Sequence, residues 1–252
     1  MTSTYFHEPA EASTNMEVPA RVLAIGAHPD DIEFGAGATL SKWAQAGTAV
    51  MIVIMTDGSK GTWDPEANPL NLAQVRQGEA RKAAGTLTGS AEVEFLGWRD
   101  GELKANDRSV SQLCYLIRKF RPDAVVGHDP WKRYRLHPDH RAAGFATTDA
   151  IVASRDPHFL PELGAHHRPN SLLLFEADEA NHCEEFGEVA LRLKIEALLC
   201  HRSQHLSSME INNAGEGTEL RQFRETVRSS GERTGALFGV ELGESFHLIR
   251  GL

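Results

Sequence analysis

The sequence predicts a Rossmann-like α/β fold: a doubly wound, mostly parallel sheet with helices on both faces. The alternation of strand-length and helix-length segments predicts it, and the length of the chain fits it. Short apolar runs of strand length alternate with longer segments of helical character from residue 21 onward, and such alternation is typical of right-handed crossovers between parallel strands. The chain has 252 residues, a length that suits one α/β domain.

The expected elements follow one another with short connections. Strands are expected at 22–27, 49–55, 91–96, 124–127 and 171–175, and helices at 35–45, 72–87, 110–120, 139–154 and 188–200. The helix at 110–120 has the clearest apolar stripe, with residues at i, i+3, i+4 and i+7, and Pro122 ends it. Gly47 has the position of a helix C-cap. A loop is expected at 58–71, and a last helix is expected from Thr218, which would cap it.

Residues 1–20 are expected to form a flexible N-terminal arm, and residues 21–252 a single domain. The arm is acidic and lacks the positive start and apolar stretch of a secretory signal. No run of about 18 apolar residues is present, so no membrane span is expected. Three cysteines without C-x-x-C spacing fit a reducing compartment. We therefore expect a cytoplasmic protein, and the exposed arm is compatible with a homo-oligomer.

The charge balance excludes one class of partner. The formal net charge is −9, whereas proteins that bind nucleic acid rely on Lys and Arg side chains to neutralise phosphates. A nucleic-acid partner is therefore not expected.

Residues that bind metals follow two of the expected strands. His28-Pro29-Asp30-Asp31 follows the first strand, and His137-Pro138-Asp139-His140 follows the fourth. Open parallel sheets bind ligands beyond the carboxyl ends of their strands, near the point where strand order reverses. Catalytic zinc takes three protein ligands, usually His nitrogens and carboxylate oxygens, and leaves one position for water. The predicted ligands are His28, Asp31 and His140.

The neighbouring residues suggest acid–base roles. A bound zinc ion lowers the pKa of water from about 15.7 towards about 7. Asp30, beside a ligand but not one itself, is the predicted general base. His137 is the predicted partner of the oxyanion or of the leaving amine, and Asp139 would orient it.

These two segments carry a resemblance to a known family. AHPDDIEFGAGATL at 27–40, followed by HPDHRAAG at 137–144, resembles the LmbE-like (PIG-L) family of zinc-dependent N-acetylglucosaminyl deacetylases. The likeness covers roughly residues 21–204. Shorter flanking pieces with the same resemblance are Thr56-Asp57-Gly58, Arg76-Gln77-Gly78-Glu79, Leu96-Gly97-Trp98-Arg99-Asp100-Gly101 and His201-Arg202-Ser203-Gln204.

The resemblance implies an enzyme that removes the acetyl group of an N-acetylglucosamine-type substrate with the ligands and base named above. It also matches Arg76 to a family arginine that contacts substrate, and Asp100, on the loop rim, joins it as a candidate substrate-binding residue. Zinc is the implied metal, although ferrous iron suits the same ligands. Two departures stand out: Ile32 separates the acid Glu33 from the His-Pro-Asp-Asp segment, and Arg135 stands where some members carry a tyrosine.

Other interpretations of the same residues stay open. A His-Pro-Asp-Asp turn can simply cap a helix, and Asp139 can be a plain N-cap. His128 and His201 fit surface or helix-end positions as well as a site. An amidase acting on a thiol (mycothiol-type) conjugate would use the same metal chemistry. A non-catalytic sugar- or nucleotide-binding module is the alternative from another class, although the Gly35-Ala36-Gly37 segment lacks the third glycine of a dinucleotide loop.

Overall fold

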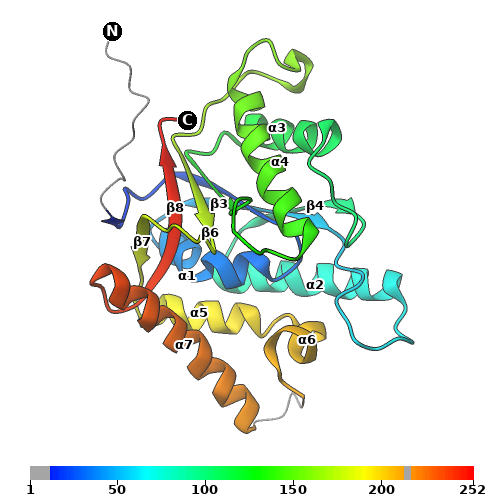
Figure 1. The fold of residues 1–252 in the computed structure, drawn as a ribbon, viewed down its shortest axis with the longest axis vertical. Coiled ribbons are helices and arrows are strands. Elements are labelled where there is room, and N and C mark those ends of the chain that lie inside the picture. Colours follow the sequence, from blue (N-terminus) through cyan, green and yellow to red (C-terminus); the bar gives the residue numbers. More distant parts are fainter. Residues whose placement is uncertain (1–11, 213–216) are drawn as a thin grey trace.

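The computed structural model describes residues 12–212 and 217–252. Its strands form one sheet in the order β1-β7-β8-β6-β5-β2-β3-β4, and Figure 1 shows helices around this sheet. The strands are β1 (Ser13–Thr14), β2 (Arg21–Gly26), β3 (Ala49–Thr56), β4 (Glu92–Trp98), β5 (Ala124–His128), β6 (Ser171–Phe175), β7 (His182–Glu185) and β8 (Gly243–Arg250). The α-helices are α1 (Asp31–Gln45), α2 (Pro69–Thr88), α3 (Asp107–Phe120), α4 (Pro138–Arg155), α5 (Glu188–Leu198), α6 (His205–Met209) and α7 (Thr218–Phe238).

The sheet confirms the predicted fold class. Strands β4, β3, β2, β5 and β6 pair in parallel, and only β8 runs antiparallel to its neighbours β6 and β7. The chain moves outward from β2 to β3 and β4, then returns to place β5 on the other side of β2. The strand order therefore reverses between β2 and β5, and the carboxyl ends of these two strands form the expected ligand-binding position.

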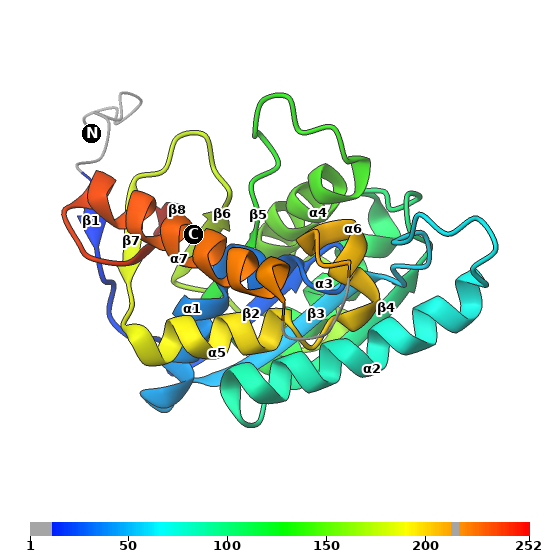
Figure 2. The same ribbon diagram turned by 90° about the horizontal axis from the view of Figure 1, so that it is seen from below.

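Helices cover both faces of the sheet. Successive side chains of each strand point to opposite sides, so each strand packs against both helix layers. Val22 and Ala24 pack with residues of α1 and α2 on one face, whereas Leu23 and Ile25 pack with residues of α3 and α4 on the other. Figure 1 shows these two layers, and Figure 2 shows α5 and α2 running along the first face with α7 beside α5.

Several helices begin earlier than the sequence indicated. The first begins at Asp31 rather than at residue 35, so a predicted metal ligand is its first residue. The third begins at Asp107, because Asn106 and Ser109 form a capping box that the apolar stripe did not reveal. In the last helix, the prediction that Thr218 is the cap was wrong. Gly217 has the N-cap position and Thr218 is the first helical residue.

The strands at the far edge of the sheet were not predicted. The antiparallel strand β8 lies between β6 and β7, and β7 pairs with Ser13–Thr14. The described end of the expected N-terminal arm is therefore part of the sheet. Residues 1–11 and 213–216 lie outside the described residues, and the second range falls within the loop that the sequence predicts at 212–217. Within the described ranges, none of the helices combines the length and apolar character needed to cross a membrane.

Candidate metal centre and catalytic cleft

A cleft of about 430 Å³ opens at the carboxyl ends of β2 and β5. The turn from β2 into α1 and the start of α4 place side chains there, and residues of the surrounding loops complete the wall. The lining residues are His28, Asp30, Asp31, Phe34, Lys60, Gly61, Arg76, Asp100, Gly101, His137, His140, Glu176, Gln204 and Ser208. Every predicted site residue except the buried Asp139 lines this cleft.

The three predicted ligands face one another, and Asp31 lies near His140 through Oδ1 and near His28 through Oδ2. His28 Nδ1 lies 3.1 Å from His140 Nε2, His140 Nε2 lies 3.3 Å from Asp31 Oδ1, and His28 Nδ1 lies 3.4 Å from Asp31 Oδ2. A tetrahedral zinc ion with bonds of about 2.0–2.2 Å holds its ligand atoms about 3.4 Å apart. Two imidazole nitrogens and a carboxylate at this spacing, beside an open cleft, therefore fit a divalent cation.

Asp30 is held in a strained conformation beside these ligands. Its φ angle is 99°, in the left-handed region, which costs a non-glycine residue about 1–3 kcal/mol. The side chain is buried, and its Oδ1 lies 3.6 Å from Arg76 Nη2. Burial raises the pKa of Asp30 to about 7, and the charge of Asp31 adds to this rise while Arg76 opposes it. Without a bound cation, Asp30 is thus a carboxyl group that changes protonation near neutral pH.

The Asp139 carboxylate hydrogen-bonds to His28 rather than to His137, the partner expected from the sequence. Asp139 is fully buried, and its Oδ2 lies 3.1 Å from His28 Nε2. The backbone N–H groups of Gly101 and Leu103 also donate to its carboxylate, at 2.6 and 3.1 Å. Burial opposes ionisation of Asp139, but the hydrogen bonds from His28 and Gly101 hold its pKa below the ordinary value. Asp139 therefore orients His28, leaving the Nδ1 atom of that ring facing the other ligands.

His137 precedes α4 and projects its ring over the cleft. Its Nδ1 accepts a hydrogen bond from the Asp139 backbone N–H at 3.3 Å, and its ring packs edge-on against His28 with centroids 4.6 Å apart. Burial and the nearby His28 lower the pKa of His137. Because Nδ1 is an acceptor in a neutral ring, Nε2 carries the proton. His137 can therefore offer an N–H donor to a bound substrate.

His128, at the end of β5, lies at the site, whereas the sequence left it open between a surface position and a site position. Its Nε2 lies 3.1 Å from Asp31 Oδ2, and its ring stacks on His140 with centroids 4.4 Å apart. Burial disfavours its imidazolium, but Asp31 and Glu176 raise its pKa above the ordinary value. The signal was present in the topology, since His128 ends the strand that pairs with β2 at the reversal of strand order.

Arg76 and Asp100 hold the loops around the cleft. Arg76 is buried and donates hydrogen bonds to the carbonyl oxygens of Pro29 at 2.6 Å and Gly58 at 2.9 Å. Asp100 Oδ2 accepts from the Lys60 N–H at 2.9 Å, and its Oδ1 lies 3.4 Å from His28 Nε2. Burial opposes ionisation of Asp100, but the contact with His28 outweighs it and lowers its pKa to about 2. Both groups border the cleft, so both can also contact a substrate.

The flanking sequence pieces meet beneath the cleft. Glu79 accepts hydrogen bonds from the backbone N–H and the hydroxyl of Ser203, at 2.9 and 2.6 Å. Gln204 donates to the carbonyl oxygen of Gly61 at 2.9 Å. Segments far apart in the sequence therefore fix the same wall, and Gln204 joins the cleft as a lining residue that the sequence did not predict.

Arg135 does not line the cleft. Its Nε lies 2.9 Å from His140 Nδ1, on the side of that ring away from the other ligands, and its guanidinium forms an ion pair with Glu176. The residue in the position of the family tyrosine therefore supports a ligand ring from behind. His137, in contrast, lines the cleft.

Comparisons with known proteins agree with this geometry. A family model described as GlcNAc-PI de-N-acetylase (PIG-L) matches residues 23–151. The diacetylchitobiose deacetylase of Thermococcus kodakarensis is 32% identical over 199 residues, which cover 73% of this chain and 70% of that protein. A 1D-myo-inositol 2-acetamido-2-deoxy-α-D-glucopyranoside deacetylase of Saccharopolyspora erythraea is 32% identical over 166 residues, covering 56% of this chain and 60% of that protein.

Solved structures extend the likeness to the whole fold. The N,N'-diacetylchitobiose deacetylase of Pyrococcus horikoshii superimposes with a TM-score of 0.81 and 30% identity, over 92% of this chain and 84% of that one. A 4-carboxy-2-hydroxymuconate hydratase of Pseudomonas putida superimposes with a TM-score of 0.73 at 19% identity, over 92% of this chain and 97% of that one, and shares the fold alone. On the match to its sequence, this chain belongs to the PIG-L (LmbE-like) family, the GlcNAc-PI de-N-acetylases.

Proposed function

We propose that this protein is a zinc-dependent hydrolase that removes the acetyl group from an N-acetylglucosamine-type amino sugar. One observation carries the proposal: the facing atoms of His28, Asp31 and His140 lie 3.1–3.4 Å apart at the mouth of a cleft. The family gives the reaction class, since its relatives named above are amino-sugar deacetylases. From the sequence analysis we further propose that the metal is zinc rather than ferrous iron. We also propose that the protein is cytoplasmic and forms a homo-oligomer.

The chain's own residues divide the proton transfers between them. A bound divalent ion supplies Lewis acidity and lowers the pKa of water. Asp30 accepts a proton from the water that adds to the acetamide carbon. His137 donates a hydrogen bond from Nε2 to the oxygen that gains negative charge. The carbon–nitrogen bond then breaks, the proton held by Asp30 passes to the amine, and acetate leaves.

Residues around the cleft keep these groups in place. Asp139 holds the His28 ring, and Arg76 ties the turn that carries Asp30 to the loop at Gly58. Arg76 and Asp100 also border the space that the sugar would occupy, so we propose that they contact its hydroxyls.

The test is acetate release by the purified protein, with its metal content measured in parallel. The panel contains N-acetylglucosamine, diacetylchitobiose, inositol-linked N-acetylglucosamine and an N-acyl thiol conjugate of glucosaminyl-inositol. We expect release from at least one acetamido sugar, loss of release with a chelator, and recovery with zinc. Turnover of the thiol conjugate alone would contradict the proposed substrate class, and full turnover in chelator would contradict the metal role.

A further inference from the structure

His201 is a buried histidine that the proton transfers described above do not use. It lies directly before the short 3-10 helix η2 (Arg202–Gln204), and no part of it is exposed. Within the described part of the chain, neither of its ring nitrogens has a hydrogen-bond partner. Buried polar atoms are rarely left without one, because their desolvation is then uncompensated. A histidine at this position therefore costs stability, which points to a role beyond packing.

The charged group that His201 faces is Glu33, in the first turn of α1. His201 Nε2 lies 3.6 Å from Glu33 Oε1, and both side chains are buried. Burial opposes ionisation of His201, but Glu33 outweighs it and raises the pKa of His201 above the ordinary value. Glu33 and His201 therefore form a buried ion pair between α1 and the segment that follows α5.

The turn that contains Glu33 also carries the proposed base. Asp30 is the N-cap residue of α1, and its carbonyl oxygen accepts a hydrogen bond from the Phe34 N–H at 3.0 Å. Because its φ of 99° is unfavourable for a residue with a Cβ atom, Asp30 keeps this conformation only where the surrounding structure holds the turn. The direction of the Asp30 carboxylate, which lines the cleft, thus depends on the contacts of this turn.

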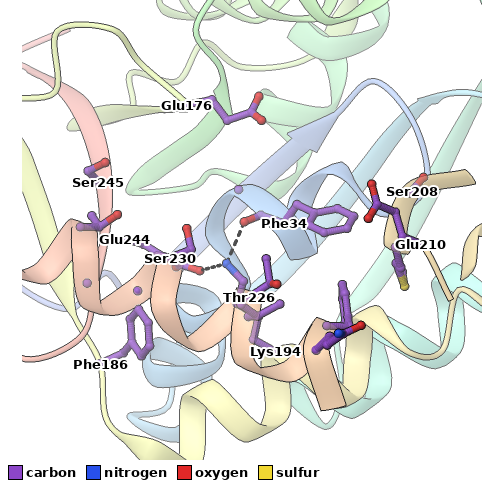
Figure 3. A pocket seen from close by; sticks show the side chains of 18 of the residues that line it. Phe34, Glu176, Phe186, Lys194, Ser208, Glu210, Thr226, Ser230, Glu244 and Ser245 are labelled. Atoms are coloured by element: carbon purple, nitrogen blue, oxygen red, sulfur yellow. Dashed lines mark hydrogen bonds and ion pairs between the residues drawn. The ribbon is translucent and has the colours of Figure 1, made fainter. Parts of the chain in front are cut away.

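Side chains from three separate elements hold the turn. Arg76, on α2, donates to the Pro29 carbonyl oxygen at 2.6 Å. Lys194, on α5, donates to the Phe34 carbonyl oxygen at 2.7 Å, a contact that Figure 3 shows. His201, on the segment after α5, holds the turn through its ion pair. Each of the three is buried, so each contact is shielded from water.

The segment that carries His201 is itself fixed. The His201 N–H donates to the Leu198 carbonyl oxygen at the end of α5, at 3.0 Å, and the His201 carbonyl oxygen accepts from the Gln204 N–H at 2.9 Å. Glu79 of α2 accepts from the backbone N–H and the hydroxyl of Ser203. A side chain on a rigid support can fix the residue that it contacts. His201 is therefore placed to hold the first turn of α1.

The charges beneath the cleft are consistent with this role. Asp30 and Glu33 provide two carboxylates, and Arg76 Nη2 lies 3.6 Å from Asp30 Oδ1. A protonated His201 supplies the second positive charge, so that two charges of each sign are buried together. With a neutral side chain at position 201, Arg76 would face both carboxylates, and a buried carboxylate without its own cation is strongly unfavourable.

We propose that His201 is a positioning residue for Asp30: its ion pair with Glu33 holds the first turn of α1 in the strained conformation that directs the Asp30 carboxylate into the cleft. The inference rests on the proposed function, in which Asp30 is the base. His201 is not among the described residues that line the cleft, so it acts through Asp30 and not by contact with the substrate.

His201→Phe tests this role, because it keeps a ring at the buried position and removes both nitrogens. Acetate release is measured on zinc-loaded protein, with an acetamido sugar that the wild type turns over. We expect kcat to fall about 10- to 100-fold, while KM and zinc content stay within about twofold, since the metal ligands and the cleft wall are unchanged. A kcat within about twofold of the wild type would show that His201 is purely structural, and would overturn the proposal.

His205→Phe is the matched control. His205 begins α6 in the same part of the chain, contacts the Leu199 carbonyl oxygen through Nε2 at 3.2 Å, and does not line the cleft. Its loss removes a histidine contact without touching the turn that carries Asp30, so kcat, KM and zinc content should all stay within about twofold of the wild type.

A double-mutant cycle tests whether the effect passes through the base. In an Asp30→Asn background the base is already absent, so His201→Phe should change the remaining turnover by less than about twofold. A second loss as large as the one in the wild type would mean that His201 affects turnover by another route, and the positioning role would be wrong.

A second cycle tests the ion pair and does not depend on the folding of His201→Phe. Glu33→Gln and His201→Gln each remove the charge of one partner. We expect each to lower kcat at least about fivefold, and the double variant to be no slower than the slower single variant. Additive losses would contradict the pairing of Glu33 with His201. Failure of the proposed function has a different signature, because the wild type would then release no acetate from any acetamido sugar.

Discussion

Two buried polar clusters, one around Glu184 and one around His28, Asp31 and His140, differ in whether each hydrogen-bond acceptor has its own donor. At the sheet edge, the Glu184 carboxylate accepts from His182 Nε2 at 2.8 Å, from the Met16 N–H at 2.8 Å and from the Lys42 ammonium group. Each of these contacts pairs a donor with an acceptor, and Glu184 does not line the cleft. Such a cluster contributes to the fold, because its buried charge is fully hydrogen-bonded.

The cluster at the ends of β2 and β5 is built the opposite way. His28 Nδ1, His140 Nε2 and the two oxygens of the Asp31 carboxylate face one another across 3.1–3.4 Å at the wall of a cleft. One proton can satisfy two of these atoms, but a cation can satisfy all three side chains. Facing acceptors beside open space therefore distinguish a binding site from a buried structural network, although both contain the same residue types.

The largest effect that this comparison predicts is in His140→Ala. Losing one of three ligands should remove most of the metal, and turnover should fall on the order of 1,000-fold or more. Metal analysis and acetate release measure the two effects, with His166→Ala as a control at an exposed histidine outside the cleft. A His140→Ala protein that keeps stoichiometric metal would remove this residue from the ligand set.

Asp30→Asn should separate chemistry from metal binding. The variant keeps the size of the side chain but loses the base, so turnover should fall roughly 100- to 10,000-fold, while the zinc content stays near one per chain. Asp149→Asn, at an exposed position of α4, is the control. Full turnover with bound zinc would rule out Asp30 as the base.

The predicted ligands could be identified because local motifs and sheet topology carry them. His28 and Asp31 belong to one short turn, His140 lies in the first turn of another helix, and parallel strands bring both segments to the same edge. The parallel part of the sheet was equally readable from its apolar runs. β8 was not, since its sequence GESFHLIR lacks a continuous apolar run.

The partners of single side chains could not be predicted from the sequence. Asp139 is two residues from His137, yet its carboxylate points to His28, 111 positions away, because the first turn of α4 directs it inward. The approach of His128 to Asp31 depends in the same way on the register between β2 and β5. Spacing in the sequence gives the edge of the sheet at which residues meet, whereas side-chain directions decide which of them touch.

His128→Gln tests whether His128 supports the metal ligands or only stabilises the fold. His128 contacts both Asp31 and the His140 ring, so its loss should weaken zinc binding about 10- to 100-fold, as is typical for groups that support metal ligands. Competition with a fluorescent chelator measures the affinity. An unchanged zinc affinity, with lower stability alone, would place His128 with the structural network.

Glu184→Gln should show the smallest effect on activity, with turnover and zinc content within about twofold of the wild type. Its effect is on the fold: Lys42 and His182 lose their charged partner, which should lower the free energy of unfolding by about 2 kcal/mol in urea titrations at neutral pH. The control is Glu196→Gln, since Glu196 pairs with Arg192 at the surface.

The pH dependence of that difference identifies its cause. Burial opposes ionisation of Glu184, but His182 and Lys42 outweigh it and hold its pKa below the ordinary value. The ionised carboxylate therefore stabilises the fold above the unfolded-state pKa, and this contribution disappears as the pH falls through the lower, folded-state pKa. The stability gap between wild type and Glu184→Gln should narrow in acid. If the difference in unfolding free energy stayed constant with pH, Glu184 would stabilise the fold through packing and not through its charge.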